Sequence, residues 1–118
     1  MSYDNTNIFA RILRGELPCK KAYENEHVLA FHDIRPAAPV HVLVIPTRHI
    51  AAVRDAKGSE GEQLLGSLLA FAAAVATEQG LDREGYRIVT NTGKNAGQSV
   101  DHLHLHLLGG RKLTWPPG

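Results

Sequence analysis

Three histidines alternate with leucines near the C-terminal end of the chain, where residues 101–108 read DHLHLHLL. Successive side chains of a β-strand point to opposite faces of its sheet, whereas a helix would spread these imidazoles over more than half of its circumference. As a strand, the segment places its three imidazoles on one face and the leucines between them on the other. The alternation therefore predicts a strand with one face for chemistry and one face packed on the core.

The composition is that of one ordinary globular domain, which we expect to span residues 1–118. At 118 residues the chain can bury a core of its own, and its 43% hydrophobic and 21% charged residues lie near the averages for soluble proteins. A formal charge of +1, with no basic run longer than Lys20-Lys21, gives no support for a nucleic-acid partner. The longest apolar stretch, residues 64–76, is too short to cross a bilayer, so no membrane partner is expected.

Cysteine usage and the first residues indicate the compartment. Cys19 is the only cysteine, which excludes a disulfide within the chain and fits a reducing environment. Residues 1–7 are polar and acidic and do not resemble a signal or transit peptide. Together these features predict a cytoplasmic protein.

Local patterns predict two helices and a set of short strands. N-cap candidates at residues 5–7 precede a short helix that Gly15 ends, and apolar residues at three- and four-residue spacing predict a long helix that Gly80 ends. Because the helices are separated by runs of neighbouring strands, the pattern is typical of the α+β class with an antiparallel sheet. The predicted helices cover residues 8–14 and 60–79, with a helical turn over 49–53, and the predicted strands cover 22–24, 27–32, 40–45, 86–91 and the histidine segment.

The three imidazoles are compatible with a metal site, a nucleophilic site or a structural role. Histidines two residues apart on a strand are familiar zinc ligands. Three ligands in one row would span about 13 Å at ~3.3 Å per residue, which is too far for all three to reach one ion. In the structural reading, each ring is hydrogen-bonded and partly exposed without taking part in a reaction.

Nucleophilic catalysis fits the same residues. The unperturbed pKa of imidazole lies near neutrality, so one ring can attack phosphorus or an acyl carbon while its neighbours transfer a proton or orient it. A polar loop over residues 91–99 leads into the histidine segment. Its Gly97-Gln98-Ser99 portion offers backbone N–H donors to an anion beside the imidazoles, as a phosphoryl group requires.

Residues 102–108 also match the signature of the histidine-triad (HIT) family, in which histidines alternate with apolar residues and two apolar residues end the motif. Further segments resemble one branch of that family, the histidine-triad nucleotide-binding (Hint) proteins. The resemblance covers nearly the whole chain and is not confined to the histidines. The further matching segments are residues 7–12, 30–34, 39–46, 97–100, 108–111 and 115–118.

The resemblance implies a HIT-like fold, with a five-stranded antiparallel sheet and two helices, and a homodimer in which two sheets join into one ten-stranded sheet. It also implies a purine nucleoside phosphoramidase, which binds purine nucleoside monophosphates and hydrolyses adenosine 5′-phosphoramidates to AMP and an amine. The reaction would pass through a covalent nucleotidyl-histidine intermediate and would need no metal or other cofactor.

Catalytic roles follow from the family pattern, position by position. His104, the middle histidine, matches the nucleophile. His106 matches the residue that contacts the phosphate and helps the amine to leave, and His102 matches a supporting position. His41 corresponds to a fourth histidine that orients the nucleophile, and Ser99 matches a position near the phosphate and the leaving group.

Nucleotide-binding roles are implied in the same way. Asp33 matches an acid that accepts hydrogen bonds from the ribose hydroxyls, and Asn91 matches a polar residue near the phosphate and ribose. Trp115 in the C-terminal tail is expected to reach the active site of the partner subunit and to influence the choice of leaving group. The phosphate is expected to contact Gly97, Gln98, Ser99, His104 and His106, and the base to contact Phe9, Ile12, Phe31, His32 and Ile34.

Three other functions remain open from the sequence. They are a nucleotide-binding scaffold with incidental hydrolysis, a metalloprotein with the triad as ligands, and a dinucleoside polyphosphate hydrolase of the other HIT branch. One position departs from the Hint pattern, because Asp101 stands where an aromatic residue often precedes the first motif histidine. As part of a strand, Asp101 is expected to face away from the triad.

Overall fold

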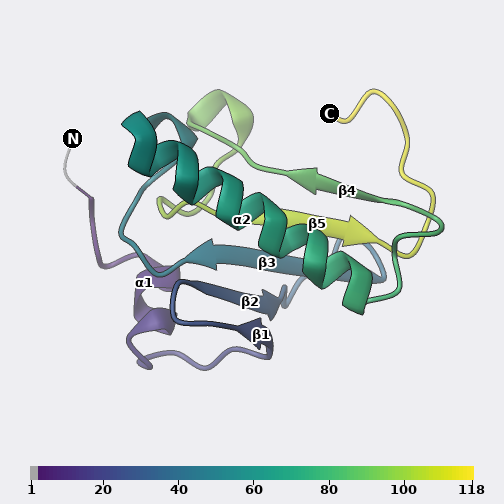
Figure 1. The fold of residues 1–118 in the computed structure, drawn as a ribbon, viewed down its shortest axis with the longest axis horizontal. Coiled ribbons are helices and arrows are strands. Elements are labelled where there is room, and N and C mark those ends of the chain that lie inside the picture. The colour runs from purple at the N-terminus through teal and green to yellow at the C-terminus, as the bar shows by residue number, and fades with distance from the viewer. Residues whose placement is uncertain (1–2) are drawn as a thin grey trace.

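A computed structural model describes residues 3–118 of the chain. Five strands form one antiparallel sheet in the order β1-β2-β3-β5-β4, and the long helix α2 lies across one face of it (Figure 1). This architecture confirms the predicted α+β class and the five-stranded antiparallel sheet with two α-helices. The elements are α1 (Ile8–Leu13), β1 (Lys21–Glu24), β2 (Val28–His32), β3 (Val40–Pro46), the 3-10 helix η1 (Val53–Asp55), α2 (Gly58–Glu78), β4 (Tyr86–Val89), the 3-10 helix η2 (Lys94–Ala96) and β5 (Leu105–Gly109).

The helix α2 covers the leucine face of the sheet. Its buried residues recur at three- and four-residue spacing, as Leu68 and Ala72 do, and so form one apolar stripe. This stripe packs against Leu103, Leu105 and Leu107 in one apolar cluster. Full burial of a leucine contributes about 1.5–3 kcal/mol, so these contacts hold the histidine segment with its imidazoles turned to the opposite face.

The short helix α1 packs on that opposite face. Asn7 caps it, since its side-chain oxygen accepts a hydrogen bond from the Ala10 N–H at 2.9 Å. Gly15 follows the helix with a φ of 77°, a conformation that glycine adopts without strain. Phe9 of α1 packs edge-on against Phe31 of β2 in a second apolar cluster. The predicted short helix is thus confirmed, one residue shorter at its C-terminal end.

The central strand β3 brings a fourth histidine to the triad. It lies between β2 and β5, and all of its residues except the first are buried. Its register pairs Leu43 with His106, so His41 lies diagonally across from His106 on the same face. Pro46 still pairs with Val28 and therefore belongs to the strand, one residue beyond the predicted end.

The histidine segment is a strand only in its second half. β5 begins at Leu105, whereas the alternation predicted a strand from His102. The backbone before Leu105 bonds elsewhere: the Leu103 N–H donates to the Ile50 carbonyl at 2.7 Å, and the Thr90 hydroxyl donates to the carbonyl that precedes β5 at 2.9 Å. The alternation of faces nevertheless persists, because the leucines pack under α2 while the imidazoles lie on the α1 side.

Other element boundaries also differ from the predicted ones. β4 ends at Val89, two residues early, so Asn91 lies in the following loop. The helical turn predicted over residues 49–53 is instead the 3-10 helix η1, which starts where the prediction ended. None of the helices within residues 3–118 is long and apolar enough to cross a membrane.

Candidate active site

A cavity of about 570 Å³ opens on the α1 side of the sheet. It is bounded by α1 and the segment after it, by the end of β2, and by β5 with the loop before it. Its walls are mostly apolar and include a few polar side chains, which is the usual construction of a small-molecule site. The predicted site residues that line it are Phe9, Ile12, Phe31, His32, Asp33, Ile34, Ser99, His104 and His106.

The hydrogen bond of His104 fixes which of its ring nitrogens carries the proton. The Nδ1 atom lies 2.6 Å from the main-chain oxygen of His102, and a carbonyl oxygen only accepts. The neutral ring is therefore protonated at Nδ1 and has a free lone pair at Nε2. Burial lowers the pKa of His104, and this effect outweighs the His102 carbonyl and Asp33, which raise it. His104 is thus neutral at pH 7, the state in which an imidazole is nucleophilic.

His41 and His106 form a directional pair. The Ala37 N–H donates to His41 Nδ1 at 2.9 Å, so the neutral His41 ring carries its proton on Nε2. That atom lies 2.9 Å from His106 Nδ1 and donates to it, which leaves the His106 proton on Nε2. Burial, with His104 and His41 adding to it, lowers the pKa of His106 to about 4. The pair therefore presents a neutral N–H donor at the cavity wall.

His102 lies behind the cavity and does not line it. Its side chain is 0% exposed, and its Nε2 donates to the Pro46 carbonyl at 2.9 Å. Burial lowers the pKa of His102 to about 4, despite the Pro46 bond, so the ring is neutral. Of the three alternating imidazoles, only His104 and His106 reach the cavity.

The glycine-bearing loop is held by the side chain of Gln98. Its oxygen accepts from the Gly93 N–H at 2.9 Å, and its amide nitrogen donates to the carbonyls of Ala51 at 2.7 Å and Val100 at 3.0 Å. Gly97 has a φ of 77°, which favours glycine where η2 ends. Ser99 lines the cavity, whereas Gly97, Gln98 and Asn91 do not, although all three were expected to contact the nucleotide.

Asp33 lies beside the histidine pair as well as at the cavity wall. One carboxylate oxygen accepts from the Arg35 N–H at 2.8 Å, and the other lies 3.4 Å from His41 Nε2. The ligand atoms of Asp33, His41 and His106 all lie within 4.8 Å of one another, as metal ligands would. The row of triad histidines does not form this group, because both ring nitrogens of His102 are already hydrogen-bonded.

Some residues of the site were missed by the sequence analysis. Leu43 could have been found, because the period of β3 puts it on the same face as His41. Cys19 lines the cavity, and burial raises the pKa of its thiol, which keeps it protonated. Tyr3 donates a hydrogen bond to His102 Nδ1, yet nothing in the polar segment around it indicated such a contact.

Two predicted positions lie away from the cavity. Asp101 is not in a strand, contrary to expectation, and with Asp4 and Ser99 it lines a smaller adjoining hollow of about 280 Å³. It therefore lies beside the site rather than on the far face of the sheet, because β5 starts later than predicted. Trp115, in the C-terminal tail, is 79% exposed and contacts no part of the cavity within this single chain.

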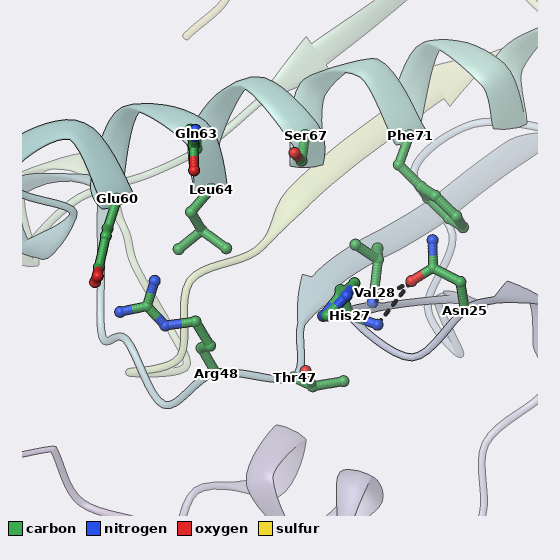
Figure 2. A pocket seen from close by; sticks show the side chains of 10 residues that line it. All are labelled: Asn25, His27, Val28, Thr47, Arg48, Glu60, Gln63, Leu64, Ser67 and Phe71. Carbon is green, nitrogen blue, oxygen red and sulfur yellow. Dashed lines mark hydrogen bonds between the residues drawn. The ribbon is translucent and has the colours of Figure 1, made fainter.

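A separate pocket of about 330 Å³ lies between α2 and the ends of β2 and β3 (Figure 2). Arg48 and Glu60 point into it from opposite sides, and Asn25 accepts hydrogen bonds from the backbone N–H groups of His27 and Val28 there. None of the triad histidines lines this pocket, and it lies on the α2 side of the sheet. The cavity under α1 is therefore the candidate active site.

Known proteins are similar to this chain in both sequence and fold. The family model of the HIT domain matches residues 14–113. An uncharacterized HIT-like protein of Synechococcus elongatus is 53% identical over 111 residues, which are 94% of this chain and 96% of that protein. A 14 kDa zinc-binding protein of Zea mays is 47% identical over 116 residues, which are 98% of this chain and 90% of that protein.

The backbones of several solved structures are also similar to that of this chain. A HIT family hydrolase from Legionella pneumophila has a TM-score of 0.90 at 47% identity, covering 94% of this chain and 98% of that chain. A histidine triad nucleotide-binding protein from Candida albicans has a TM-score of 0.79 at 32% identity, covering 93% and 82%. The sheet and the alternating histidines are thus those of a HIT-fold protein. The chain belongs to the HIT domain family.

Proposed function

We propose that this protein is a purine nucleoside phosphoramidase of the Hint branch, with His104 as the nucleophile. One observation carries the proposal. The His102 carbonyl engages the protonated Nδ1 of His104 and leaves Nε2 with a free lone pair, in a residue that lines a cavity of about 570 Å³. That volume lies within the range of small-molecule sites. The ring is neutral because burial lowers its pKa.

The proposed reaction has two displacements at phosphorus. His104 Nε2 forms a bond to the α-phosphorus, the P–N bond breaks, and the amine leaves with one proton that His106 delivers from solvent. Water then attacks the same phosphorus, the Nε2–P bond breaks, and AMP is released while the proton of the water returns to solvent. Overall, one water is consumed and one amine and one AMP are formed. Such double displacement replaces one difficult step by two easier ones.

The cavity supports a purine nucleoside monophosphate as the bound portion. Phe9, Phe31 and Ile12 provide apolar walls that we assign to the base. Asp33 lines the same cavity, and we assign its carboxylate to the ribose hydroxyls, which can donate to it. Ser99 lines the same cavity as His104 and His106, and we assign these three residues to the phosphate. In this proposal Gly97, Gln98 and Asn91 shape the phosphate loop. Two proteins of the same fold, a HIT family hydrolase from Legionella and a nucleotide-binding protein from Candida, support this assignment.

The proposal includes a cytoplasmic homodimer. The strand β4 is an edge of the sheet, because within residues 3–118 it pairs only with β5. Two such edges would join into the ten-stranded sheet that the resemblance implies. Trp115 is 79% exposed, which suits a residue that acts on a partner subunit. Sedimentation velocity would test the dimer: a monomer at micromolar concentration would refute this part of the proposal.

The direct test is His104→Ala with an adenosine 5′-phosphoramidate that has a fluorescent amine. We expect hydrolysis to fall to background. A rapid quench of the wild type in alkaline denaturant should trap an adenylylated peptide that contains His104, because the N–P bond survives in alkali but not in acid. The matched control is His27→Ala, an exposed histidine on the other side of the sheet, which should keep the wild-type rate. A His104→Ala variant that hydrolyses near the wild-type rate would refute the assignment.

Metal binding is a second candidate function that one observation favours. Asp33, His41 and His106 are grouped as ligands would be, and a relative from Zea mays is named a zinc-binding protein. Elemental analysis of the purified protein separates the two candidates. Stoichiometric zinc whose removal abolishes hydrolysis would support a metalloenzyme. Rates on a phosphoramidate and on a diadenosine polyphosphate, compared side by side, would identify a hydrolase of the other HIT branch.

A further inference from the structure

The buried ring of His102 has two hydrogen-bond partners from distant parts of the chain. Its Nε2 donates to the Pro46 carbonyl at 2.9 Å, so in the neutral ring Nδ1 must accept. The hydroxyl of Tyr3 is the donor to that Nδ1. No buried side-chain nitrogen or oxygen within residues 3–118 is without a partner, and removal of the Tyr3 hydroxyl would leave one at the completely buried His102.

The Tyr3 hydroxyl is itself held in place by Asn7. The Asn7 amide nitrogen donates to the Tyr3 oxygen at 2.9 Å, while the Asn7 side-chain oxygen caps α1 through the Ala10 N–H. The ring of His49 stacks on the Tyr3 ring, with centroids 4.7 Å apart and planes 13° apart. Donors and acceptors therefore alternate in one direction, from Asn7 through Tyr3 and His102 to the Pro46 carbonyl.

This chain of bonds ends next to the candidate nucleophile. The carbonyl of His102 accepts from His104 Nδ1 at 2.6 Å, so the position of residue 102 sets the position of that carbonyl. With the other tautomer of His102, the Nε2 lone pair would face the Pro46 oxygen, and the ring would have to turn away. The Pro46 carbonyl therefore selects the Nε2–H tautomer, and the Tyr3 hydroxyl fixes the ring by donating to the remaining lone pair at Nδ1, as second partners of histidines do at other sites.

We propose that Tyr3 is a positioning residue for the nucleophile: its hydroxyl donates to Nδ1 of His102, holds that ring against the Pro46 carbonyl and thereby keeps the His102 carbonyl in place for His104. The kinetic part of this inference rests on the proposed phosphoramidase function. Tyr3 does not line the cavity, so it orients the reacting ring without contacting the nucleotide.

The test compares Tyr3→Phe with Tyr23→Phe in the full chain. Both changes remove one tyrosine hydroxyl, but Tyr23 bonds to Gln79 at 3.4 Å, remote from the histidines. For Tyr3→Phe we expect kcat on the phosphoramidate to fall about tenfold. The affinity for AMP, measured by calorimetry, and KM should stay within about twofold of the wild type, because the nucleotide cavity is intact. Tyr23→Phe should match the wild type in all three.

A second measurement does not depend on enzyme activity. The ¹⁵N shifts and long-range couplings of labelled histidines distinguish a ring protonated at Nε2 from one protonated at Nδ1. We expect His102 to be the Nε2–H tautomer in the wild type and in Tyr23→Phe, with the ¹⁵N shift of a hydrogen-bonded Nδ1. In Tyr3→Phe the Pro46 carbonyl should keep the proton on Nε2, while the Nδ1 shift should move toward that of an unbonded ring nitrogen. A wild type without phosphoramidase activity but with this pattern of shifts would refute the proposed function and leave the positioning of His102 by Tyr3 supported.

Two results would overturn the inference. One is an unchanged ¹⁵N shift of His102 Nδ1 in Tyr3→Phe together with an unchanged kcat. The other is a fall in AMP affinity that matches the fall in kcat, which would indicate a general loss of structure. Asn7→Ser gives a graded check, because serine retains the N-cap of α1 but cannot reach Tyr3 with an amide. It should lower kcat less than Tyr3→Phe does. A larger loss would contradict the proposed series of hydrogen bonds, in which Asn7 acts on His102 only through Tyr3.

Discussion

The main-chain oxygen of His102 lies 2.6 Å from Nδ1 of His104, two residues further along the chain. The motif thus orients its own candidate nucleophile through the backbone, and any residue at position 102 would supply the same carbonyl. The imidazole of His102 supports that carbonyl by its bond to Pro46. The two histidines therefore have different roles, one supporting and one nucleophilic, although they occupy equivalent positions in the alternating pattern.

His102→Ala should retain part of the activity, with kcat lowered about tenfold to a hundredfold, since the carbonyl remains but loses its support. His104→Ala should retain none. Single-turnover hydrolysis of an adenosine phosphoramidate measures both. Equal loss in the two variants, with both folded by circular dichroism, would show that the His102 ring takes part in the reaction itself.

Stability should decrease as the pH falls below about 6.5. Burial lowers the pKa of His102 from 6.5 to about 4, so between these values only the unfolded chain binds the proton at this site. The contribution of His102 to the free energy of unfolding is therefore complete above pH 6.5, and up to ~3 kcal/mol of it is lost by about pH 4. Urea unfolding at pH 7 and pH 4.5 measures the difference. His102→Asn should reduce it, and an identical pH dependence in that variant would contradict the attribution.

Leu107→Ala should destabilise the fold by about 2–5 kcal/mol, because the side chain is completely buried under α2 and its removal leaves a cavity. The control is Leu69→Ala on α2, where the side chain is 52% exposed and the expected change is within about 0.5 kcal/mol. Chemical denaturation at pH 7 compares the two. Similar losses would mean that the outer face of α2 is covered in solution.

Asp33→Asn should lower kcat/KM about tenfold to a hundredfold on a ribonucleoside phosphoramidate, the effect of a lost hydrogen bond to a charged group. The amide oxygen can still accept from the Arg35 N–H, so the turn is retained. A 2′,3′-dideoxy substrate should reduce the wild-type rate by a similar factor and should not reduce the variant further. Additive losses from the two changes would place the ribose away from Asp33.

Chelators should leave hydrolysis unchanged, whereas added Zn²⁺ should inhibit it. Zinc bound by Asp33, His41 and His106 would break the hydrogen bond between the two imidazoles and occupy the proton donor at the cavity wall. Asp33→Asn should weaken this inhibition, which a titration of rate against free zinc would measure. Activation by zinc would instead favour the metalloprotein alternative.

Much of the framework follows from local patterns. The alternation of histidine and leucine predicts which side chains face α2, because strand geometry has a period of two at every position. The cap at Asn7 and the spacing of Leu68 and Ala72 predict the helices for equally local reasons. The early end of β4 and the late start of β5 were not predictable, since hydrogen bonds from Thr90 and Leu103 to other segments decide them.

The sequence by itself determined the sheet face on which the histidines lie, and its family resemblance singled out His104. Only the tertiary structure decided which groups meet there: Asp33 beside His41, His41 against His106, and Tyr3 against His102, 99 residues apart. A period is a property of neighbouring backbone angles and can be read along the chain. A contact between distant residues depends on strand register and on how α1 packs, which no local pattern contains.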